Sequence, residues 1–357
     1  MTNIKFYLTQ GQRMLRNKFK QFKRYAGNAE EICNHILKNC WNGRFFQTST
    51  TNFPQFWTRD FGMCTESLIK LGYTKEVEQT LRYALAIFSL HNKITTTITP
   101  DDRLFDFPTH AVDTLPWLIH SIALTKNKKL VDDFRPFLEQ QVNKFTKTFV
   151  DQSGLVKPYH YSSIKDFAIR KSSCYDNCML GMLQQDMKAL KLNNPIEHFD
   201  YEKILMNYFW NGNYFYDDMS KRNYIAGDAN LFPFHCNIIK SKSILKKAFQ
   251  SIHDAQLDEP FPLKYTEKNA NVKFIIQEIF MHNYERDSIW LHLGPLYVNL
   301  LKTIDKKRAQ LYIDRYTKMI EHFGTFPEVL TAKGKPFTAP FYHCDQGMLW
   351  CANYVVL

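Results

Sequence analysis

One short stretch of the sequence combines residue types that could bind a polar ligand. Trp57, Arg59 and Asp60 stand together in "FWTRDFG", directly before an apolar segment that reads as a helix. A helix-capping carboxylate in a surface ion pair would explain Asp60, because caps are common and such pairs contribute about 0–1 kcal/mol. A ligand explains all three residues, since carboxylates and guanidinium groups hydrogen-bond hydroxyls and an aromatic face covers apolar surface. These residues are therefore candidate contacts to a polyhydroxylated molecule.

Further polar and aromatic clusters follow at wide intervals along the chain. They are "DFPTHAVD" (106–113), "YHYSSIKD" (159–166), "GDAN" (227–230), "YERD" (284–287) and "FPEV" (326–329). Two of their carboxylates have two open interpretations: Asp113 either caps the next helix or contacts the ligand, and Asp228 either caps a helix or lines the site. Cleavage of a glycosidic bond needs two carboxyl groups, one protonated and one that activates water or attacks.

The elements that must position these clusters are helices. Apolar residues recur at helical spacing, and only 13 glycines and 14 prolines interrupt 357 residues, which argues against an all-β fold. The expected helices span 29–40, 60–71, 75–90, 114–124, 130–150, 173–190, 201–209, 230–239, 243–253, 272–282, 288–304, 306–323 and 345–355. No linker divides the series. We expect one all-α domain over residues 28–357, built from antiparallel helix pairs that close into a ring of inner and outer helices. The clusters fall on alternate connections, so they would meet at one mouth of that ring.

Composition and charge narrow the range of partners. The net charge is +11, and residues 1–27 carry cations without any acidic residue beside apolar residues at helical spacing. This basic N-terminal arm is either a membrane-surface helix, a targeting segment, a nucleic-acid arm or a solvated helix packed on the domain. The other cations are scattered without interleaved aromatics, so we expect no nucleic acid as partner.

The cysteines and histidines give no sign of a metal or a disulfide framework. The eight cysteines contain no CxxC pair, and the histidines at 110, 160, 235 and 343 lack metal-ligand spacing. No apolar run approaches the length of a membrane span. We therefore expect a cytoplasmic protein that needs neither metal nor cofactor.

Four segments resemble the inverting glycosidases that have an (α/α)6 barrel, the clan of glucoamylases, debranching-enzyme glucosidases, trehalases and processing α-glucosidases. "QFWTRDFGMCTESLIKLGY" is similar to the clan's first motif, whose Arg and Asp hold sugar hydroxyls, and these match Arg59 and Asp60. "HAVDTLPWLI" resembles a helix start in debranching-type enzymes. "YSSIKDFAIRKSSCYDNCML" resembles the segment of the general acid, which implies Asp166 in that role. "FPEVLTAKGKPFTAPFYHCDQGMLW" resembles the segment of the general base, which implies Glu328.

The chain departs from that pattern beside the acid. Ile164-Lys165 stands where the clan has a Trp, and Lys165 would lower the pKa of Asp166 if the two touched. Asp176 is the reserve candidate for the acid. The resemblance implies a hydrolase that cleaves an α-linked glucoside or related sugar with inversion.

Two other kinds of function stay open. An (α/α)6 ring also hosts other sugar-active enzymes, namely epimerases, unsaturated-uronide hydrolases and phosphorylases, of which the epimerases would need paired histidines in the centre. A catalytically inactive sugar-binding scaffold would keep Arg59 and Asp60 but lose the acid.

Overall fold

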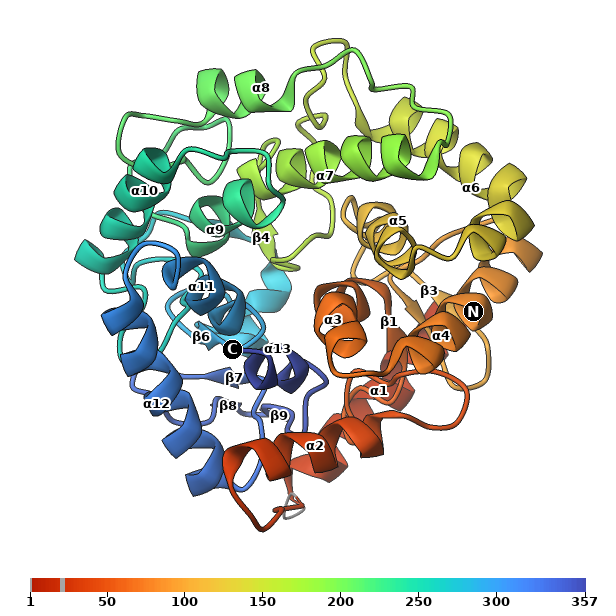
Figure 1. Cartoon of the computed structure of the whole chain (residues 1–357). Coiled ribbons are helices and arrows are strands. Elements are labelled where there is room, and N and C mark those ends of the chain that lie inside the picture. Colours follow the sequence, from red (N-terminus) through yellow and green to blue (C-terminus); the bar gives the residue numbers. More distant parts are fainter. Residues whose placement is uncertain (1, 20–22) are drawn as a thin grey trace.

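The computed structural model describes residues 2–19 and 23–357, and the helices within them form two concentric layers (Figure 1). The inner layer alternates with the outer layer along the chain. The inner helices are α3 (Thr58–Lys70), α5 (Thr114–Thr125), α7 (Cys174–Leu190), α9 (Gly227–His235), α11 (Gly294–Leu301) and α13 (Cys351–Val355). The outer helices are α2 (Ala29–Cys40), α4 (Thr74–Leu90), α6 (Lys128–Phe149), α8 (Tyr201–Tyr208), α10 (Lys242–Asp254) and α12 (Lys306–Phe323).

The ring closes through its two ends. Each inner helix contacts the next, from α3 through α5, α7, α9 and α11 to α13, and α13 contacts α3. The outer helix α12 likewise contacts α2. The expected all-α (α/α)6 toroid in a single domain is therefore confirmed for the described part of the chain.

The two faces of the ring differ in their connections. Connections from an inner to the next outer helix are short, as at 71–73 and 126–127, whereas those from an outer to an inner helix are long, as at 91–113 and 255–293. Because every inner helix follows a long connection, all inner helices run in the same direction and begin at the long-loop face. The long connections contain short strands that pair with one another. They are β1 (Phe56–Trp57), β2 (Thr97–Ile98), β3 (Leu104–Phe105), β4 (Ala168–Ile169), β5 (Lys273–Phe274), β6 (Ile289–Trp290), β7 (Val329–Leu330), β8 (Thr338–Ala339) and β9 (Tyr342–His343).

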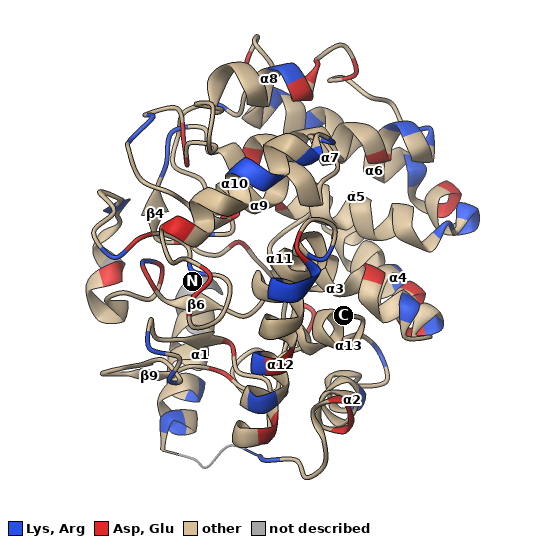
Figure 2. Cartoon of the chain, turned by 60° about the vertical axis from the view of Figure 1, so that its left-hand side comes forward, with Lys and Arg blue, Asp and Glu red and all other residues tan. Residues whose placement is uncertain are grey.

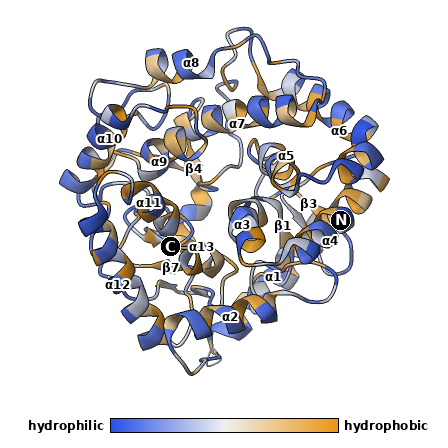
Figure 3. Cartoon of the chain, in the orientation of Figure 1, coloured by the Kyte–Doolittle hydropathy of each residue, from blue (hydrophilic) through white to orange (hydrophobic). Residues whose placement is uncertain are grey.

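Helix ends follow local capping chemistry. Asn28 and Glu31 form a capping box at the start of α2, and the Asp305 side chain accepts the N–H of Arg308 at the start of α12. Gly324 ends α12 in the left-handed conformation that glycine adopts without strain. Apolar residues of the outer helices face the inner layer (Figure 3). Sequence and structure agree on both ends of α2 and α12.

Three expected helices differ from the structure in more than the position of their ends. Residues 272–282 form β5 and the 3₁₀ segment η1 (Ile276–Met281) instead of a ring helix, because Phe274 pairs with Ala168 of β4. The helix expected at 288–304 is only α11, since residues 289–290 form β6, which pairs with β7. The helix expected at 345–355 is only α13, because Gly347 has φ 68° and interrupts it.

The basic N-terminal segment contains helix α1 (Thr2–Lys18), which lies at the long-loop face beside β9 (Figure 2). Phe6 is buried and stacks on Phe105 with ring centroids 4.2 Å apart. The Gln10 side chain donates to the carbonyl of Asn52 at 2.8 Å. The described part of the arm is thus a helix packed on the ring, which is one of the alternatives that the sequence left open. No helix within residues 2–19 and 23–357 is long and apolar enough to cross a membrane.

Candidate active site

The long-loop face contains a cavity of about 540 Å³. Its walls come from α1, from the start of α3, and from the connections that precede α3, α5, α7, α11 and α13. Five of the seven predicted site residues line it, namely Trp57, Arg59, Asp60, Asp166 and Glu328. Loops that are far apart in sequence therefore meet at this cavity, as we expected for a closed ring of helices.

Glu328 lies on this wall with both carboxyl oxygens hydrogen-bonded. Tyr284 donates its hydroxyl to Oε1 at 2.5 Å, and Oε2 accepts the N–H of Asp345 at 2.7 Å and the hydroxyl of Tyr342. Burial raises the pKa of Glu328 to about 7, and the charge of Asp345 adds to this rise against the tyrosine hydrogen bonds. A carboxyl group with a pKa near neutrality is able to accept a proton from water.

Asp166 lies on the same cavity and is held by a hydroxyl and a cation. Its Oδ1 accepts the Ser162 hydroxyl at 2.8 Å and is 3.5 Å from Nη2 of Arg59. Burial raises the pKa of Asp166, with a contribution from Asp113, while Arg59 and Ser162 oppose the rise. A raised pKa is what a general acid requires.

The backbone of Asp166 is fixed by Glu285, which also lines the cavity. Glu285 accepts the N–H of Asp166 at 2.7 Å and that of Phe167 at 2.8 Å. Burial raises the pKa of Glu285 to about 8, and the charge of Asp166 adds to this rise, while the two backbone N–H groups oppose it. Ionisation of either carboxyl group therefore disfavours ionisation of the other.

Arg59 and Asp60 open helix α3 and have different neighbours. Nε of Arg59 is 2.7 Å from Oδ2 of the fully buried Asp113, which also accepts the Tyr175 hydroxyl at 2.9 Å. Asp60 accepts the indole N–H of Trp350 at 3.0 Å, and burial raises its pKa to about 6. Asp113 does not line the cavity, so its expected ligand contact is corrected: it orients Arg59 from behind.

Lys165 points away from Asp166. Its ammonium group is buried, 2.7 Å from Asp228 and 3.1 Å from Asp217. Arg170 joins the same two carboxylates at 2.9 Å and 3.5 Å. We call these four residues the buried charge cluster. Lys165 therefore pairs with this cluster and not with the candidate acid.

The buried charge cluster also corrects the expectation for Asp228. Its side chain is fully buried between Lys165 and Arg170 and does not line the cavity, so it holds the acid-bearing loop from behind. Burial would raise the pKa of Asp217, but the charges of Lys165 and Arg170 outweigh it and lower that pKa. The reserve acid Asp176 lies in the first turn of α7, outside the cavity wall.

Sequence reasoning missed several residues that complete the cavity. His292 lines it with an unpartnered Nδ1, and burial together with Arg59 lowers its pKa well below the usual range. His110 and His235 do not line it. The paired histidines that an epimerase needs are therefore not found on this wall. Tyr284 stands in the cluster "YERD" that the sequence singled out, but without a predicted role, and the indole of Trp350 gave no signal beyond its residue type.

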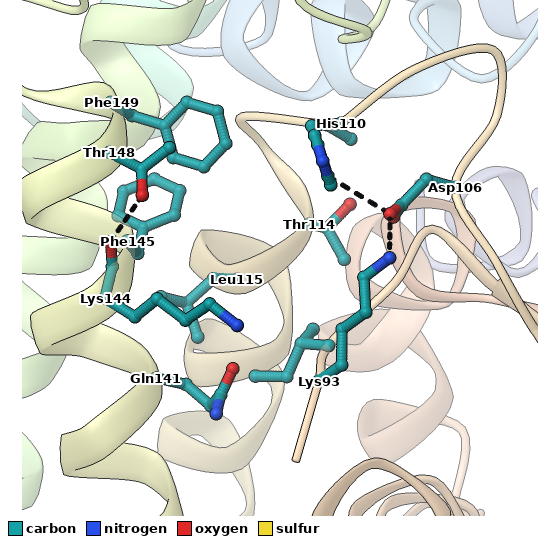
Figure 4. Close-up of a pocket in the computed structure, with 12 residues that line it drawn as sticks. Lys93, Asp106, His110, Thr114, Leu115, Gln141, Lys144, Phe145, Thr148 and Phe149 are labelled. Atoms are coloured by element: carbon teal, nitrogen blue, oxygen red, sulfur yellow. Dashed lines mark hydrogen bonds and ion pairs between the residues drawn. The ribbon is translucent and has the colours of Figure 1, made fainter. Parts of the chain in front are cut away.

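A second, smaller cavity lies between α5, α6 and the loop at 106–111 (Figure 4). Its one carboxylate, Asp106, is 2.6 Å from Nζ of Lys93 and 3.2 Å from Nδ1 of His110. With a single carboxyl group already paired, this cavity lacks the two groups that glycosidic cleavage requires.

Fold and cavity together define an (α/α)6 ring with carboxyl groups at its long-loop mouth. No family model matches the sequence, and no similar protein is found among curated sequences. Solved structures are similar in fold. A rhamnosidase from Klebsiella oxytoca with rhamnose bound aligns with a TM-score of 0.68 at 10% identity, over 92% of this chain and 62% of that chain.

Two further glycosidases have the same ring. A glycosidase aligns with a TM-score of 0.69 at 10% identity, over 92% of this chain and 95% of that chain. A bacterial glucoamylase complexed with acarbose aligns with a TM-score of 0.61 at 11% identity, over 92% of this chain and 54% of that chain. The present chain thus spans less than two thirds of the rhamnosidase and the glucoamylase, and nearly all of the glycosidase.

Proposed function

We propose that this protein is a glycoside hydrolase that cleaves an α-linked glucoside or a related sugar with inversion of configuration. The observation that carries the proposal is the pair Asp166 and Glu328. Both carboxyl groups line one cavity, Glu328 buried and Asp166 with 25% of its side chain exposed, and both have a raised pKa.

Each residue then has a distinct role. Asp166 donates its proton to the glycosidic oxygen, and Glu328 takes a proton from the water that attacks the anomeric carbon from the opposite face. Arg59 and Asp60 hydrogen-bond sugar hydroxyls, and Trp57 covers an apolar sugar face. Inversion requires room for the water, so carboxyl groups about 6.5–9.5 Å apart fit this mechanism, whereas about 5 Å fits retention.

The experiment measures sugar release from a panel of α-glucosides, rhamnosides and disaccharides, with proton NMR of the first product anomer. Inversion yields the anomer opposite to that of the substrate. Glu328→Gln and Asp166→Asn should each reduce turnover at least about a hundredfold. Asp166→Asn should spare substrates with good leaving groups, which need little protonation.

Asp176→Asn is the matched control, because Asp176 is a buried carboxyl with a pKa raised to about 6 that lies outside the cavity wall. It should keep turnover. Binding of a sugar without turnover of any panel member would favour the alternative, a sugar-binding scaffold on the same fold. Formation of an epimer or a sugar phosphate would favour another sugar-active enzyme.

A further inference from the structure

The cavity has two halves of different chemistry. The inner half contains the polar groups Arg59, Asp60, Asp166, Glu328 and His292. The outer half is bounded by helix α1, by η1 and by the β8–β9 hairpin, and these contribute mainly apolar side chains: Phe6, Tyr7, Met14, Phe280, Met281 and Phe341.

The apolar side chains of the outer half reach the surface. Tyr7 is 43% exposed, Phe280 61% and Phe341 63%, so the mouth is rimmed by aromatic rings. Large exposed aromatics on soluble proteins commonly mark a place of contact with apolar groups. The rim adjoins the acid, since burial and then the charge of Asp166 raise the pKa of the Tyr7 phenol.

The Gln10 side chain, which α1 contributes to this wall, has one amide N–H left for a second sugar. Oε1 of Gln10 accepts from Gln55 at 2.9 Å and from Arg13 at 3.1 Å, while its amide donates to the carbonyl of Asn52. A sugar in this half would leave many hydroxyls without partners, which is costly when they are desolvated.

We propose that the outer half of the cavity is a subsite for an apolar leaving group, so that the substrate is a sugar joined to an alkyl or aryl aglycone. This inference rests on the proposed hydrolase function. The leaving group departs on the side of the acid, and Tyr7 and Phe167 lie on the cavity wall with Asp166. A cavity of about 540 Å³ is within the range that encloses ligands larger than one sugar.

Gly11 offers a direct way to fill this subsite. It lies in the interior of α1 and lines the cavity, and a Cβ added there would meet no atom within 4 Å. Glycine within a helix is less favourable than a residue with a side chain. Gly11→Leu should therefore preserve α1 and project its side chain into the outer half.

The test compares alkyl glycosides of increasing chain length, from methyl to octyl, on the sugar that the panel identifies. Alkyl leaving groups have nearly the same acidity, so differences in kcat/KM report binding of the chain. Each methylene that enters the cavity should raise kcat/KM by up to about fourfold, mainly through KM. The octyl glycoside should be preferred over a disaccharide of the same sugar.

Gly11→Leu should abolish the gain in kcat/KM with chain length, because its side chain occupies the outer half. Gln12→Leu is the matched control, because it adds the same side chain at the next position, which is exposed and does not line the cavity. It should keep the full chain-length series.

The outcomes separate the two proposals. Hydrolysis without any dependence on chain length, or a faster reaction of the disaccharide, overturns the apolar subsite alone. A chain-length gain that persists in Gly11→Leu also overturns it, because the chain then binds elsewhere. If no glycoside is hydrolysed, the hydrolase proposal falls, and the subsite falls with it.

Discussion

The Tyr284 hydroxyl donates a hydrogen bond of 2.5 Å to Oε1 of Glu328, the candidate base. A hydrogen bond to the ionised form lowers a carboxyl pKa, and it limits the rise that burial causes. The activity of the enzyme should therefore increase as Glu328 loses its proton, with the acidic limb of the kcat/KM profile at pH about 7.

Tyr284→Phe should move this acidic limb to higher pH by about one pH unit, because it removes a donor to a charged acceptor. The measurement is the pH dependence of kcat/KM. Tyr297→Phe is the control: this buried tyrosine donates to Asp258 at 3.0 Å, outside the cavity. An unchanged limb in Tyr284→Phe would mean that Glu328 does not govern it.

Glu328→Gln should change stability in a pH-dependent way. The folded protein raises this pKa from 4.5 to about 7, so the native state binds the proton more tightly than the unfolded chain. Its contribution is full below pH 4.5 and is lost as the pH rises to about 7. An amide avoids this loss, since the Tyr284 hydroxyl is able to accept from it.

The variant should therefore exceed the wild type in free energy of unfolding by on the order of 3 kcal/mol at pH 8, and the difference should vanish near pH 4. Urea unfolding at both values measures it. A difference of the same size at both values would contradict the raised pKa.

Lys165→Met should destabilise the fold. It would leave the buried Asp217 and Asp228 with one cation, Arg170, among their described ion-pair partners, and breaking a buried ion pair on one side costs about 3–5 kcal/mol. Lys171→Met removes the same charge from an exposed position and should stay within about 0.5 kcal/mol of the wild type. Thermal unfolding compares the two. Equal melting temperatures would indicate that the buried charge cluster is not essential.

Asp60→Asn should weaken sugar binding by about 1.5–3 kcal/mol at pH 7.5, where the carboxylate is ionised and accepts sugar hydroxyls. Because the pKa of Asp60 is raised to about 6, wild-type affinity should itself fall as the pH drops through that value. The variant should lack this dependence. Calorimetric titration at pH 7.5 and at a pH below the Asp60 pKa measures the sugar affinity, with Glu328→Gln as background to prevent turnover. Unchanged affinity in Asp60→Asn would mean that Asp60 does not bind the sugar and only stands at the start of α3.

The sequence predicted the ring because its helices are amphipathic and locally capped. Helix α12 shows this well: Asp305, Gly324 and the apolar stripe between them define both ends without any tertiary contact. The same reasoning wrongly predicted a helix at 272–282. Its apolar residues Ile276, Ile279 and Phe280 stay exposed, and its strand pairs with β4, a contact between residues about a hundred positions apart.

The candidate site likewise contains residues that the sequence predicted correctly and residues that it did not. Asp60 and Asp228 both stand in the first turn of an inner helix, yet only Asp60 lines the cavity. What separates them is the burial of Lys165 and Arg170 beside Asp228, which no local pattern reveals. Glu285 stands in the cluster "YERD" that the sequence singled out, but its role was missed because its partners are the backbone N–H groups of the distant loop that carries Asp166.

The common direction of the inner helices has an electrostatic consequence. The N-terminal end of a helix has a partial positive charge of about half a unit, and here these ends converge on one mouth. Asp60, Asp166, Glu285, Glu328 and Asp345 gather there with Arg59 as the one cation among the residues on the cavity wall. The convergent helix dipoles supply a positive potential that side chains alone do not provide. The same potential favours the ionised form of each carboxyl group at this mouth, so it opposes the rise in pKa that burial causes.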